Sequence, residues 1–422
     1  MSRTPRHGVR GPIARHTKLR SPGFLAQGVK ALAFIVSAAL VAVVGVGAYA
    51  YTDLTSTLRG NSVTLEGQDT DPPEVDVLPN EAVNILVTGI DKCEEDWLDD
   101  FGGRCTEEMA ERQKDSYEEQ LNDVNMIVHI SAEPRSVTVI QIPRDMMTSR
   151  PACTDIDGNE TWPVAVAPFN EAYGTGGLPC VVDTAEELTG LEIRHAALMT
   201  WGGVIDITNA IGGVDVCVAN DIEDREHTGL VLDAGEHTLA GMEALQFLRV
   251  RESIGDGSDL ARIGNQQVYM GALVRKLVSN ETLGDVGALL RLSNAVVENA
   301  TLSSGLTSDP MALVSIARAV SGVPTSDYAF IQMPALDYPA DANKVIQDES
   351  AWAQISAALE ANQPIVVGEE PEPDATPEPT PDPTVEPTGT PTPNPTQVPL
   401  PGNLSGSNAD DEVSCGTQEG LF

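Results

Sequence analysis

Hydrophobic runs of strand length alternate along this chain with longer amphipathic stretches. Continuous apolar runs predict buried strands at 83–90, 124–130, 136–142, 214–219 and 328–333. The segment SAEPR between the second and third runs predicts a hairpin. Helix-like composition and periodicity predict helices at 183–190, 202–213, 241–249, 259–280, 282–298, 309–320 and 350–361. Strands interleaved with helices predict an α/β fold, with a mixed central β-sheet flanked by helices on both faces.

Near the N-terminus, residues 31–51 form one apolar run without a charge. About 20 apolar residues in a helix span the ~30 Å hydrocarbon core of a bilayer. Residues 1–30 contain seven basic residues and no acidic residue, so we expect them to stay in the cytoplasm. The AYA sequence at 48–50 would also fit a cleaved signal peptide. An apolar signal region is usually about 7–15 residues long, however, which favours an uncleaved anchor.

These features divide the chain into five segments. We expect a cytoplasmic basic leader at 1–30, a transmembrane helix at 31–51, a polar stalk at 52–80, an extracellular globular domain at 81–365 and a Pro/Thr/Glu-rich tail at 366–422. The tail has too little apolar surface to fold and should be disordered or extended polyproline II. At about 3.1 Å per residue it could reach up to ~100 Å, which suits either a simple spacer or a segment that crosses a cell wall.

The chain carries 63 acidic and 25 basic residues, for a formal net charge of −38. It also contains six cysteines, which suit disulfides outside the cytoplasm. No CxxC pair is present, so a metal site of cysteines is disfavoured. Six cysteines allow 15 pairings. Spacing favours Cys93 with Cys105, which share one acidic insertion at 92–120, and then Cys153 with Cys180.

Despite this acidity, three arginines fall within fourteen residues: Arg249, Arg251 and Arg262. A guanidinium group can bind phosphate oxygens in bidentate fashion, and each charge-assisted hydrogen bond contributes about 1.5–3 kcal/mol. If the segment LRVRES is extended, Arg249 and Arg251 share one face. Arg262 and Gln266 are four residues apart on the next predicted helix and are therefore neighbours. The cluster predicts a site for a pyrophosphate with apolar surroundings.

Further polar residues stand at the ends of predicted strands, where α/β proteins build their sites. Arg144 and Asp145 follow the strand that ends before Pro143, and Asp91 and Asp123 border two other strands. Two carboxylates that face phosphates would suit Mg²⁺, which takes oxygen ligands from one or two carboxylates and the substrate. Taken singly, an Arg-x-Arg pair is more often a surface feature and a strand-end Asp more often a turn former. Their joint occurrence carries the prediction.

Seven segments together resemble the LytR-CpsA-Psr family of membrane-anchored cell-envelope proteins of Gram-positive bacteria: NILVTGIDK, NDVNMIVHI, VTVIQIPRDMM, FNEAYGTGG, NAIGGVDVCV, GEHTLAGMEALQFLRVR and DGSDLARIGNQQ. The resemblance spans roughly residues 82–280. It implies a phosphotransferase that moves a glycopolymer from a polyprenyl-pyrophosphate carrier onto peptidoglycan outside the membrane, assisted by Mg²⁺. It also implies an apolar tunnel for the polyprenyl chain between the sheet and the helices.

By motif, the resemblance assigns pyrophosphate binding to Arg144, Arg249, Arg251, Arg262 and Gln266. The catalytic set would then be Arg144, Asp145, Arg249, Arg251 and Arg262, with Asp91 and Asp123 as metal ligands and with Asp123 or Asp145 as the base. Cysteines comparable to Cys153 and Cys180 occur in actinobacterial relatives.

The chain departs from the family pattern at two positions. Leu121 stands where the family often has Arg, and Pro168 stands where it often has Lys. These losses leave two alternatives open: a phosphatase that cleaves the lipid pyrophosphate with water, and a non-catalytic envelope scaffold that binds polyprenyl phosphate. Nothing in the sequence resembles a DNA-binding element, so we expect no nucleic-acid partner.

Overall fold

A computed structural model describes residues 56–57, 60, 62–65, 81–101, 105–114, 116–117, 119–251, 253–254, 259–279, 282, 285–307, 316, 319–366, 398–399 and 406–408. All of them lie in the second of two units, Leu54–Phe422. The predicted leader at 1–30 and membrane span at 31–51 fall outside the described residues. Within the described part, none of the helices combines the length and the apolar character that crossing a membrane requires.

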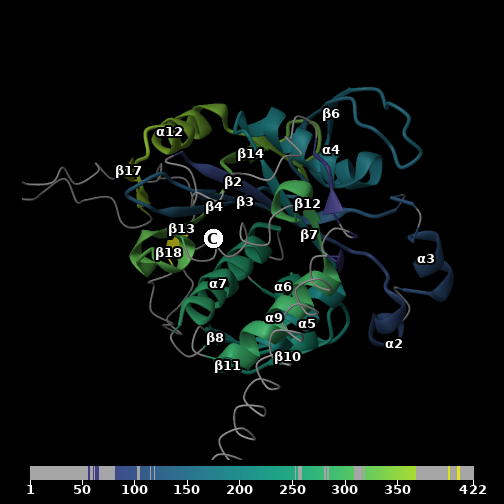
Figure 1. Cartoon of the computed structure of the whole chain (residues 1–422), viewed down its shortest axis with the longest axis vertical. Helices are drawn as coiled ribbons and strands as arrows, with labels where there is room; N and C mark the ends of the chain where they lie inside the picture. The colour runs from purple at the N-terminus through teal and green to yellow at the C-terminus, as the bar shows by residue number, and fades with distance from the viewer. Residues whose placement is uncertain are drawn as a thin grey trace, which may run out of the picture. The chain divides into compact units, whose positions relative to one another are not determined.

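An eight-stranded mixed sheet forms the centre of the fold (Figure 1). In spatial order its strands are β1 (Ser62–Val63), β12 (Ala300–Ser303), β7 (His195–Met199), β2 (Val83–Ile90), β3 (Asn122–Ile130), β4 (Val137–Gln141), β13 (Tyr328–Gln332) and β18 (Gly406–Asn408). Strand β3 pairs antiparallel with both β2 and β4, so the predicted hairpin is confirmed. Strands β7 and β13 pair in parallel with β2 and β4, which makes the sheet mixed as predicted.

Alternate residues of the central strands point to opposite faces of the sheet, and each face has its own core. One core joins the sheet to α4 (Ala172–Thr189) and α12 (Glu349–Glu360), and its sheet residues include Leu86, Ile127, Ile140 and Ile331. The other joins the sheet to α7 (Asp259–Val278), and its sheet residues include Val87, Met126, Val139 and Phe330. Burial on both faces explains why these strands are continuous apolar runs.

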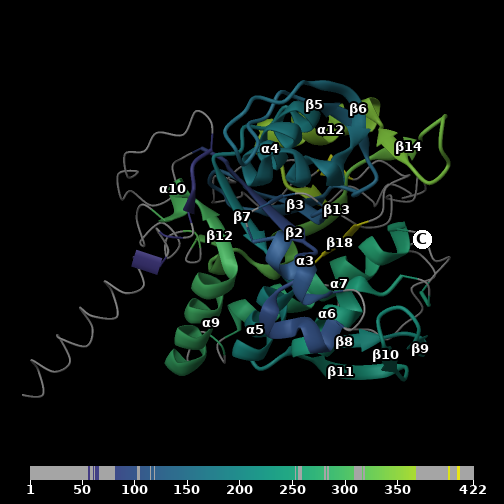
Figure 2. The ribbon, with the colours of Figure 1, turned by 90° about the vertical axis from the view of Figure 1, so that its right-hand side faces the viewer.

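Figure 2 shows these two layers, with α4 and α12 above the sheet and α7 below it. Three more helices lie in the lower layer: α5 (Trp201–Ala210), α6 (Gly241–Arg249) and α9 (Val286–Asn299). The remaining short helical elements are η1 (Glu95–Trp97), α2 (Leu98–Phe101), α3 (Glu107–Arg112), η3 (Phe169–Glu171), α10 (Ser304–Thr307) and η4 (Thr325–Asp327).

Five two-stranded sheets complete the description. Their strands are β5 (Met147–Arg150) with β6 (Val164–Pro168), β8 (Val214–Val218) with β11 (Gly235–Leu239), β9 (Ile222–Asp224) with β10 (Leu230–Leu232), β14 (Ala335–Asp337) with β15 (Val345–Gln347), and β16 (Ile365–Val366) with β17 (Val398–Pro399). The hairpin of β5 and β6 matters most for the site, because it follows directly from the end of β4.

The predicted helix at 183–190 is only the last part of α4. Three glycines and Pro179 lie in the first half of α4 and disfavour a helix there. The chain does break at Gly177, which has φ +66° and ψ −159°, and a second helical piece then begins near Pro179. Proline is tolerated in the first turn of a helix because its missing N–H has no partner there. The predicted helix at 309–320 lies largely outside the described residues.

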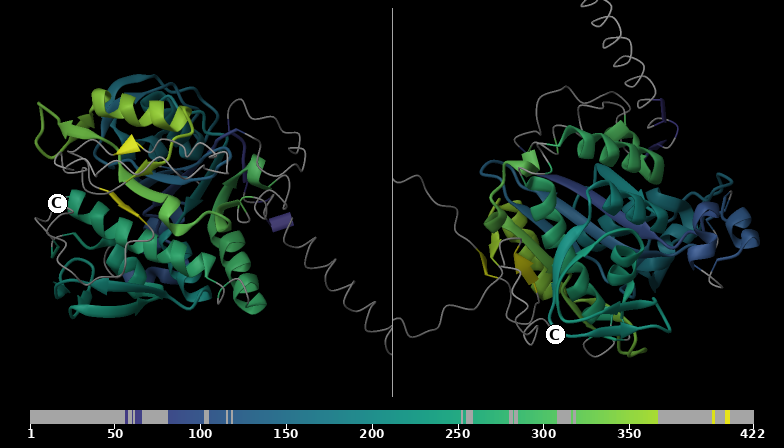
Figure 3. Two further views of the ribbon diagram at one scale, coloured as in Figure 1. Left: turned by 90° about the vertical axis from the view of Figure 1, so that its left-hand side faces the viewer. Right: turned by 90° about the horizontal axis from the view of Figure 1, so that it is seen from below.

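Parts of the predicted tail belong to the folded unit. Strand β18 pairs antiparallel with β13 at the edge of the central sheet and is yellow in Figure 3. Strand β17 pairs in parallel with β16. The prediction of an entirely disordered segment at 366–422 is therefore wrong for these five residues, because backbone pairing at a sheet edge does not require an apolar side-chain pattern.

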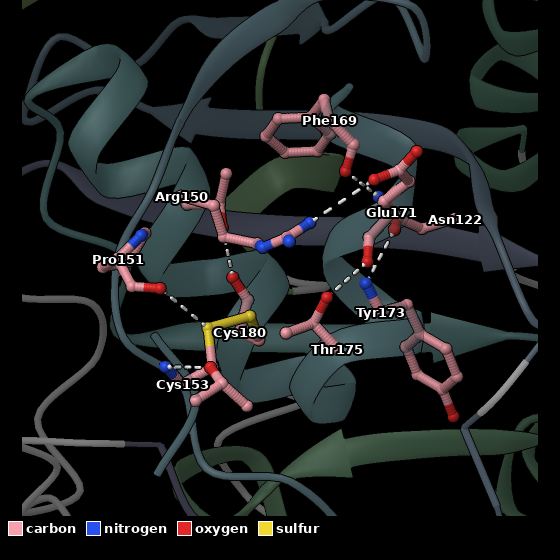
Figure 4. Close-up of a disulfide and its surroundings, with 11 residues drawn as sticks. Asn122, Arg150, Pro151, Cys153, Phe169, Glu171, Tyr173, Thr175 and Cys180 are labelled. Atoms are coloured by element: carbon pink, nitrogen blue, oxygen red, sulfur yellow. Dashed lines mark hydrogen bonds and ion pairs between the residues drawn. A yellow bond between two sulfur atoms is a disulfide. The ribbon is translucent and has the colours of Figure 1, made fainter. Parts of the chain in front are cut away.

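Two disulfides join the cysteines that spacing had favoured. Cys93 is bonded to Cys105 and Cys153 to Cys180, each with a Cα–Cα distance of 5.4 Å. The second bond ties the β5–β6 loop to α4 (Figure 4). It also requires glycine at position 176, since a Cβ there would lie 2.8 Å from the Cβ of Cys153.

We expect replacement of both Cys153 and Cys180 by Ser to lower the unfolding free energy by about 3 kcal/mol, because the bond closes a loop whose ends are 27 residues apart. Urea denaturation of the wild type and of the double variant would measure the difference. In the presence of a thiol reductant the two proteins should become nearly equal. An unchanged midpoint without reductant would contradict a stabilising role for this bond.

Candidate active site

Strand topology brings three predicted site segments to one edge of the sheet. Because β3 runs antiparallel to β2 and β4, its first residues adjoin the last residues of both neighbours. Asp91 follows β2, Asp123 is the second residue of β3, and Arg144 follows β4. The three residues stand at strand ends, as predicted. The antiparallel pairing brings these ends to the same edge of the sheet.

Asp123 is contacted by two arginines from distant parts of the chain. The Nη1 atom of Arg144 lies 3.3 Å from Oδ2 of Asp123, an ion pair in which both side chains are about one quarter exposed. The Nη2 atom of Arg262 donates a hydrogen bond of 3.2 Å to the backbone carbonyl of Asp123. Arg262 comes from α7 and is buried. Two of the arginines predicted to bind pyrophosphate thus meet at one residue.

Asp145 extends this charge cluster on the other side of Arg144. Its Oδ2 lies 3.3 Å from Nε of Arg144, and its Oδ1 is bonded by the ammonium group of Lys344. The backbone N–H of Val345 donates to the carbonyl of Asp145 at 3.2 Å, which holds Lys344 beside it. Lys344 was not predicted as a site residue, because it stands in the connection between β14 and β15, where no sequence motif marks it.

Asp91 has the most perturbed carboxyl group of the cluster. Burial raises its pKa from 3.8 to about 6, and the negative charge of Asp123 adds to this effect. Three effects lower this pKa: a hydrogen bond of 3.1 Å from the N–H of Leu121 to Oδ1, a hydrogen bond from the backbone of Asp91 itself, and the positive charge of Arg249. Asp91, Asp123 and Arg249 are therefore close enough to influence one another.

Arg249 is the last residue of α6, and its guanidinium carbon lies 3.9 Å from the centre of the Trp201 ring. The chain becomes extended only at Val250, with φ −60° and ψ 137°. The predicted helix at 241–249 is confirmed, so the condition under which Arg249 and Arg251 would share one extended face is not met. Arg251 is half-buried just beyond it. Whether its side chain binds pyrophosphate stays a prediction.

Gln266 is buried on α7, one turn after Arg262. Its side-chain oxygen accepts a hydrogen bond from Gln141 of β4, and its side-chain nitrogen donates to the carbonyl of Leu248 at 2.9 Å. The amide thus ties α7 to β4 and to the end of α6. Contact with substrate stays a prediction, whereas a role in placing Arg262 and Arg249 follows from these bonds.

A buried pair of asparagines, which was not among the predicted site residues, fixes the start of β3. The side-chain nitrogen of Asn122 donates to the Asn125 side-chain oxygen at 2.8 Å, and Asn125 also accepts from the Thr88 hydroxyl at 2.8 Å. The Asn122 side-chain oxygen accepts the N–H of Tyr173 at 3.0 Å. This network locks the backbone on both sides of Asp123. In the segment NDVN, the asparagines therefore position the aspartate between them.

Asp91 and Asp123 offer a small set of oxygen ligands for a cation. The Oδ1 atom of Asp123 is buried and has no hydrogen-bond partner among the described residues. In that same part of the chain, no three His, Cys, Asp or Glu side chains lie together as a metal cluster. Mg²⁺ often binds one or two carboxylates and takes its other ligands from water and phosphate oxygens. Two carboxylates with a spare oxygen fit this pattern.

Comparison with known proteins gives a consistent result. Residues 48–363 match the model of the LytR_cpsA_psr family. The cell wall biosynthesis protein LcpA of Corynebacterium glutamicum is 29% identical over 244 residues, which cover 53% of this chain and 45% of that protein. The chain thus matches less than half the length of that relative.

The polyisoprenyl-teichoic acid–peptidoglycan teichoic acid transferase TagT of Bacillus subtilis is 23% identical over 321 residues, 74% of this chain and 87% of that protein. The crystal structure of TagV from B. subtilis aligns with a TM-score of 0.51 and 19% identity, over 68% of this chain and 98% of that one. At this identity the structural likeness supports a shared mixed α/β fold.

We expect the Asp91→Asn substitution to stabilise the protein at pH 8 and to have little effect at pH 3.5. The folded state binds the Asp91 proton more tightly than the unfolded state, because the pKa is raised from 3.8 to about 6. The stability that this proton contributes is complete below about pH 4 and is lost as the pH rises through 6. The gain at pH 8 should be on the order of 3 kcal/mol.

Urea unfolding in EDTA at both pH values would measure this effect. The Asp145→Asn variant is the matched control and should lose stability at pH 8, because Asp145 has two cationic partners. An equal gain for Asp91→Asn at both pH values would show that its charge is not the cause.

Proposed function

Because the chain belongs to the LytR_cpsA_psr family, we propose that it is a membrane-anchored phosphotransferase that attaches a polyprenyl-pyrophosphate-linked glycopolymer to peptidoglycan. The name of TagT describes such a transfer for teichoic acid. The observation that carries the proposal is the meeting of Arg144 and Arg262 at Asp123, beside Asp91. In a chain of net charge −38, a cluster of this kind is suited to an anionic ligand.

The arginines would stabilise the charge that develops while the phosphodiester bridge breaks. A sugar hydroxyl of peptidoglycan attacks the phosphorus next to the glycopolymer, a new P–O bond forms, and polyprenyl phosphate leaves with the electron pair of the old bond. Fixed guanidinium groups lower the barrier because they are oriented before the reaction begins. The contacts of Arg144 with Asp123 and Asp145 supply this orientation.

Asp91 and Asp123 would hold Mg²⁺, which would neutralise part of the phosphate charge. That role leaves Asp145 as the carboxylate at the cluster that could accept the hydroxyl proton. Its contacts with Lys344 and Arg144 hold this carboxylate in place beside the arginine.

The proposed location is the outer side of the cytoplasmic membrane, with the N-terminus inside and residues 31–51 as a single-pass anchor. The disulfides Cys93–Cys105 and Cys153–Cys180 support this side of the membrane, because such bonds persist in oxidising compartments. The partners would be the membrane, the lipid-linked glycopolymer and peptidoglycan.

We expect the Arg262→Ala substitution to reduce transfer by about 100-fold or more, which is typical for loss of one preorganised donor. The assay would use the full-length chain in detergent, a polyprenyl-pyrophosphate-linked glycan and purified peptidoglycan. Arg262→Lys should also lose most of the activity, since it keeps the charge but lacks the planar fork. Full transfer by Arg262→Ala would rule out this site.

Because Arg262 is buried, circular dichroism should first establish that each variant is folded. Arg194→Ala is the matched control, since Arg194 is an exposed arginine paired with Glu192, and it should transfer normally.

Omission of peptidoglycan distinguishes transfer from hydrolysis. A transferase should then stop, whereas a phosphatase should continue to release product.

We expect the Asp123→Asn substitution to raise the Mg²⁺ concentration needed for half-maximal transfer by about tenfold, on the order of 1.4 kcal/mol. The hydrogen bond from Arg262 would remain, because it is made to the backbone of residue 123. Asp145→Asn should instead lower the maximal rate and leave the Mg²⁺ dependence unchanged. Identical Mg²⁺ curves for Asp123→Asn and the wild type would contradict the proposed metal ligands.

A further inference from the structure

The guanidinium group of Arg249 packs against an aromatic ring. Its guanidinium carbon lies 3.9 Å from the centre of Trp201, the first residue of α5. Phe101 packs edge-on against the same indole, with ring centres 4.9 Å apart and planes at 71°. Trp201 thus lies between a site arginine and the ring of Phe101.

Phe101 belongs to a segment that the Cys93–Cys105 bond closes into a loop. We call residues 93–101 and 105–113 the buttress. Its side chains Cys93, Phe101, Cys105 and Ala110 form a small apolar cluster with Ile205 and Leu245, and Trp201 packs against it. The backbone N–H of Cys93 also donates to the buried side chain of Gln113 at 2.8 Å, which ties the two ends of the buttress together.

The buttress forms hydrogen bonds with both residues that flank Trp201 in the sequence, Thr200 and Gly202. One carboxylate oxygen of Glu94 accepts the hydroxyl of Thr200 at 2.8 Å, and the other accepts the N–H of Gly202 at 2.8 Å. A negative charge at the N-terminus of α5 is also favourable with respect to the helix dipole. A Cβ on residue 202 would lie 2.5 Å from Glu94 and 2.5 Å from Trp97, so this approach requires glycine. The indole of Trp201 is therefore fixed at its backbone and at its ring.

An arginine that binds phosphate gains from such support. Its side chain loses rotamer freedom when it is immobilised, and a surrounding excess of acidic residues offers it other partners. A cation over an indole ring is attracted to the ring face, and the ring orients the plane of the guanidinium. The side chain of Arg249 is then partly ordered before substrate binds.

From these contacts we infer that Trp201 is a positioning residue that orients Arg249 for the pyrophosphate, and that the disulfide-closed buttress holds Trp201 in place. The inference rests on the proposed function, because it takes Arg249 to be a pyrophosphate ligand. It assigns to the buttress an influence on substrate affinity that acts through Trp201 and Arg249.

A double-mutant cycle tests the inference. The dissociation constant of a C20 isoprenyl pyrophosphate would be measured for the full-length chain in detergent as wild type, Trp201→Leu, Arg249→Ala and the double variant. We expect Trp201→Leu to weaken binding about fivefold in the wild type and less than twofold in the Arg249→Ala background. Trp201→Phe should weaken binding only about twofold, since it keeps an aromatic face.

Two further variants separate positioning from general loss of stability. Trp352→Leu makes the same substitution at a buried tryptophan in the core of the opposite face, and it should lower the melting temperature without changing the dissociation constant. The double replacement of Cys93 and Cys105 by Ser should weaken binding of the probe severalfold, but not in the Arg249→Ala background. A merely structural role would weaken binding equally with and without Arg249.

Equal losses from Trp201→Leu in both backgrounds, or no loss at all, would overturn the inference. The proposed function would survive that result as long as Arg249→Ala and Arg262→Ala still weaken binding. A folded wild-type protein that does not bind the probe would overturn the inference and the proposed function together.

Discussion

The ion pair between Arg144 and Asp123 is the contact on which the rest of the site depends. Both side chains are only about one quarter exposed, so each has lost much of its hydration and would be costly without the other. Asp123 in turn holds Arg262 through its backbone carbonyl, and its charge is felt by Asp91. Loss of Arg144 would leave the Asp123 carboxylate without this cation, and loss of the Asp123 carboxylate would remove the charge that is felt by Asp91, while the backbone contact with Arg262 would remain.

The sheet creates this contact by its topology. An antiparallel strand between two others brings one beginning and two ends to the same edge, and here these positions carry Asp123, Asp91 and Arg144. The buried asparagine pair at 122 and 125 then prevents the first residues of β3 from fraying. The site thus combines a rigid strand edge with a helix, α7, that presents Arg262 from across the second core.

Sequence patterns predicted the local part of this arrangement well. The run at 83–90 and the helix at 241–249 have the bounds that the structure gives, because their apolar spacing is set by burial against the sheet and its helices. The strand-end positions of Asp91, Asp123 and Arg144 followed from the same runs. What the sequence could not show were contacts between distant segments. Lys344 reaches Asp145 across 199 residues, and Trp201 meets Arg249 through the packing of α5. Patterns of local spacing carry no information on such pairs.

The substitution at position 121 connects these observations. The resemblance expects an arginine there, which would lie next to Asp91 and Asp123, but Leu121 supplies only a backbone N–H to Asp91. Two carboxylates that influence each other then depend on fewer cations, and Arg249 is the one whose charge is felt by Asp91. The same arginine is the one that Trp201 and the disulfide-closed segment hold in place. A site that lacks one arginine needs the others in fixed positions, because a mobile charge spends part of its time too far away to compensate a carboxylate.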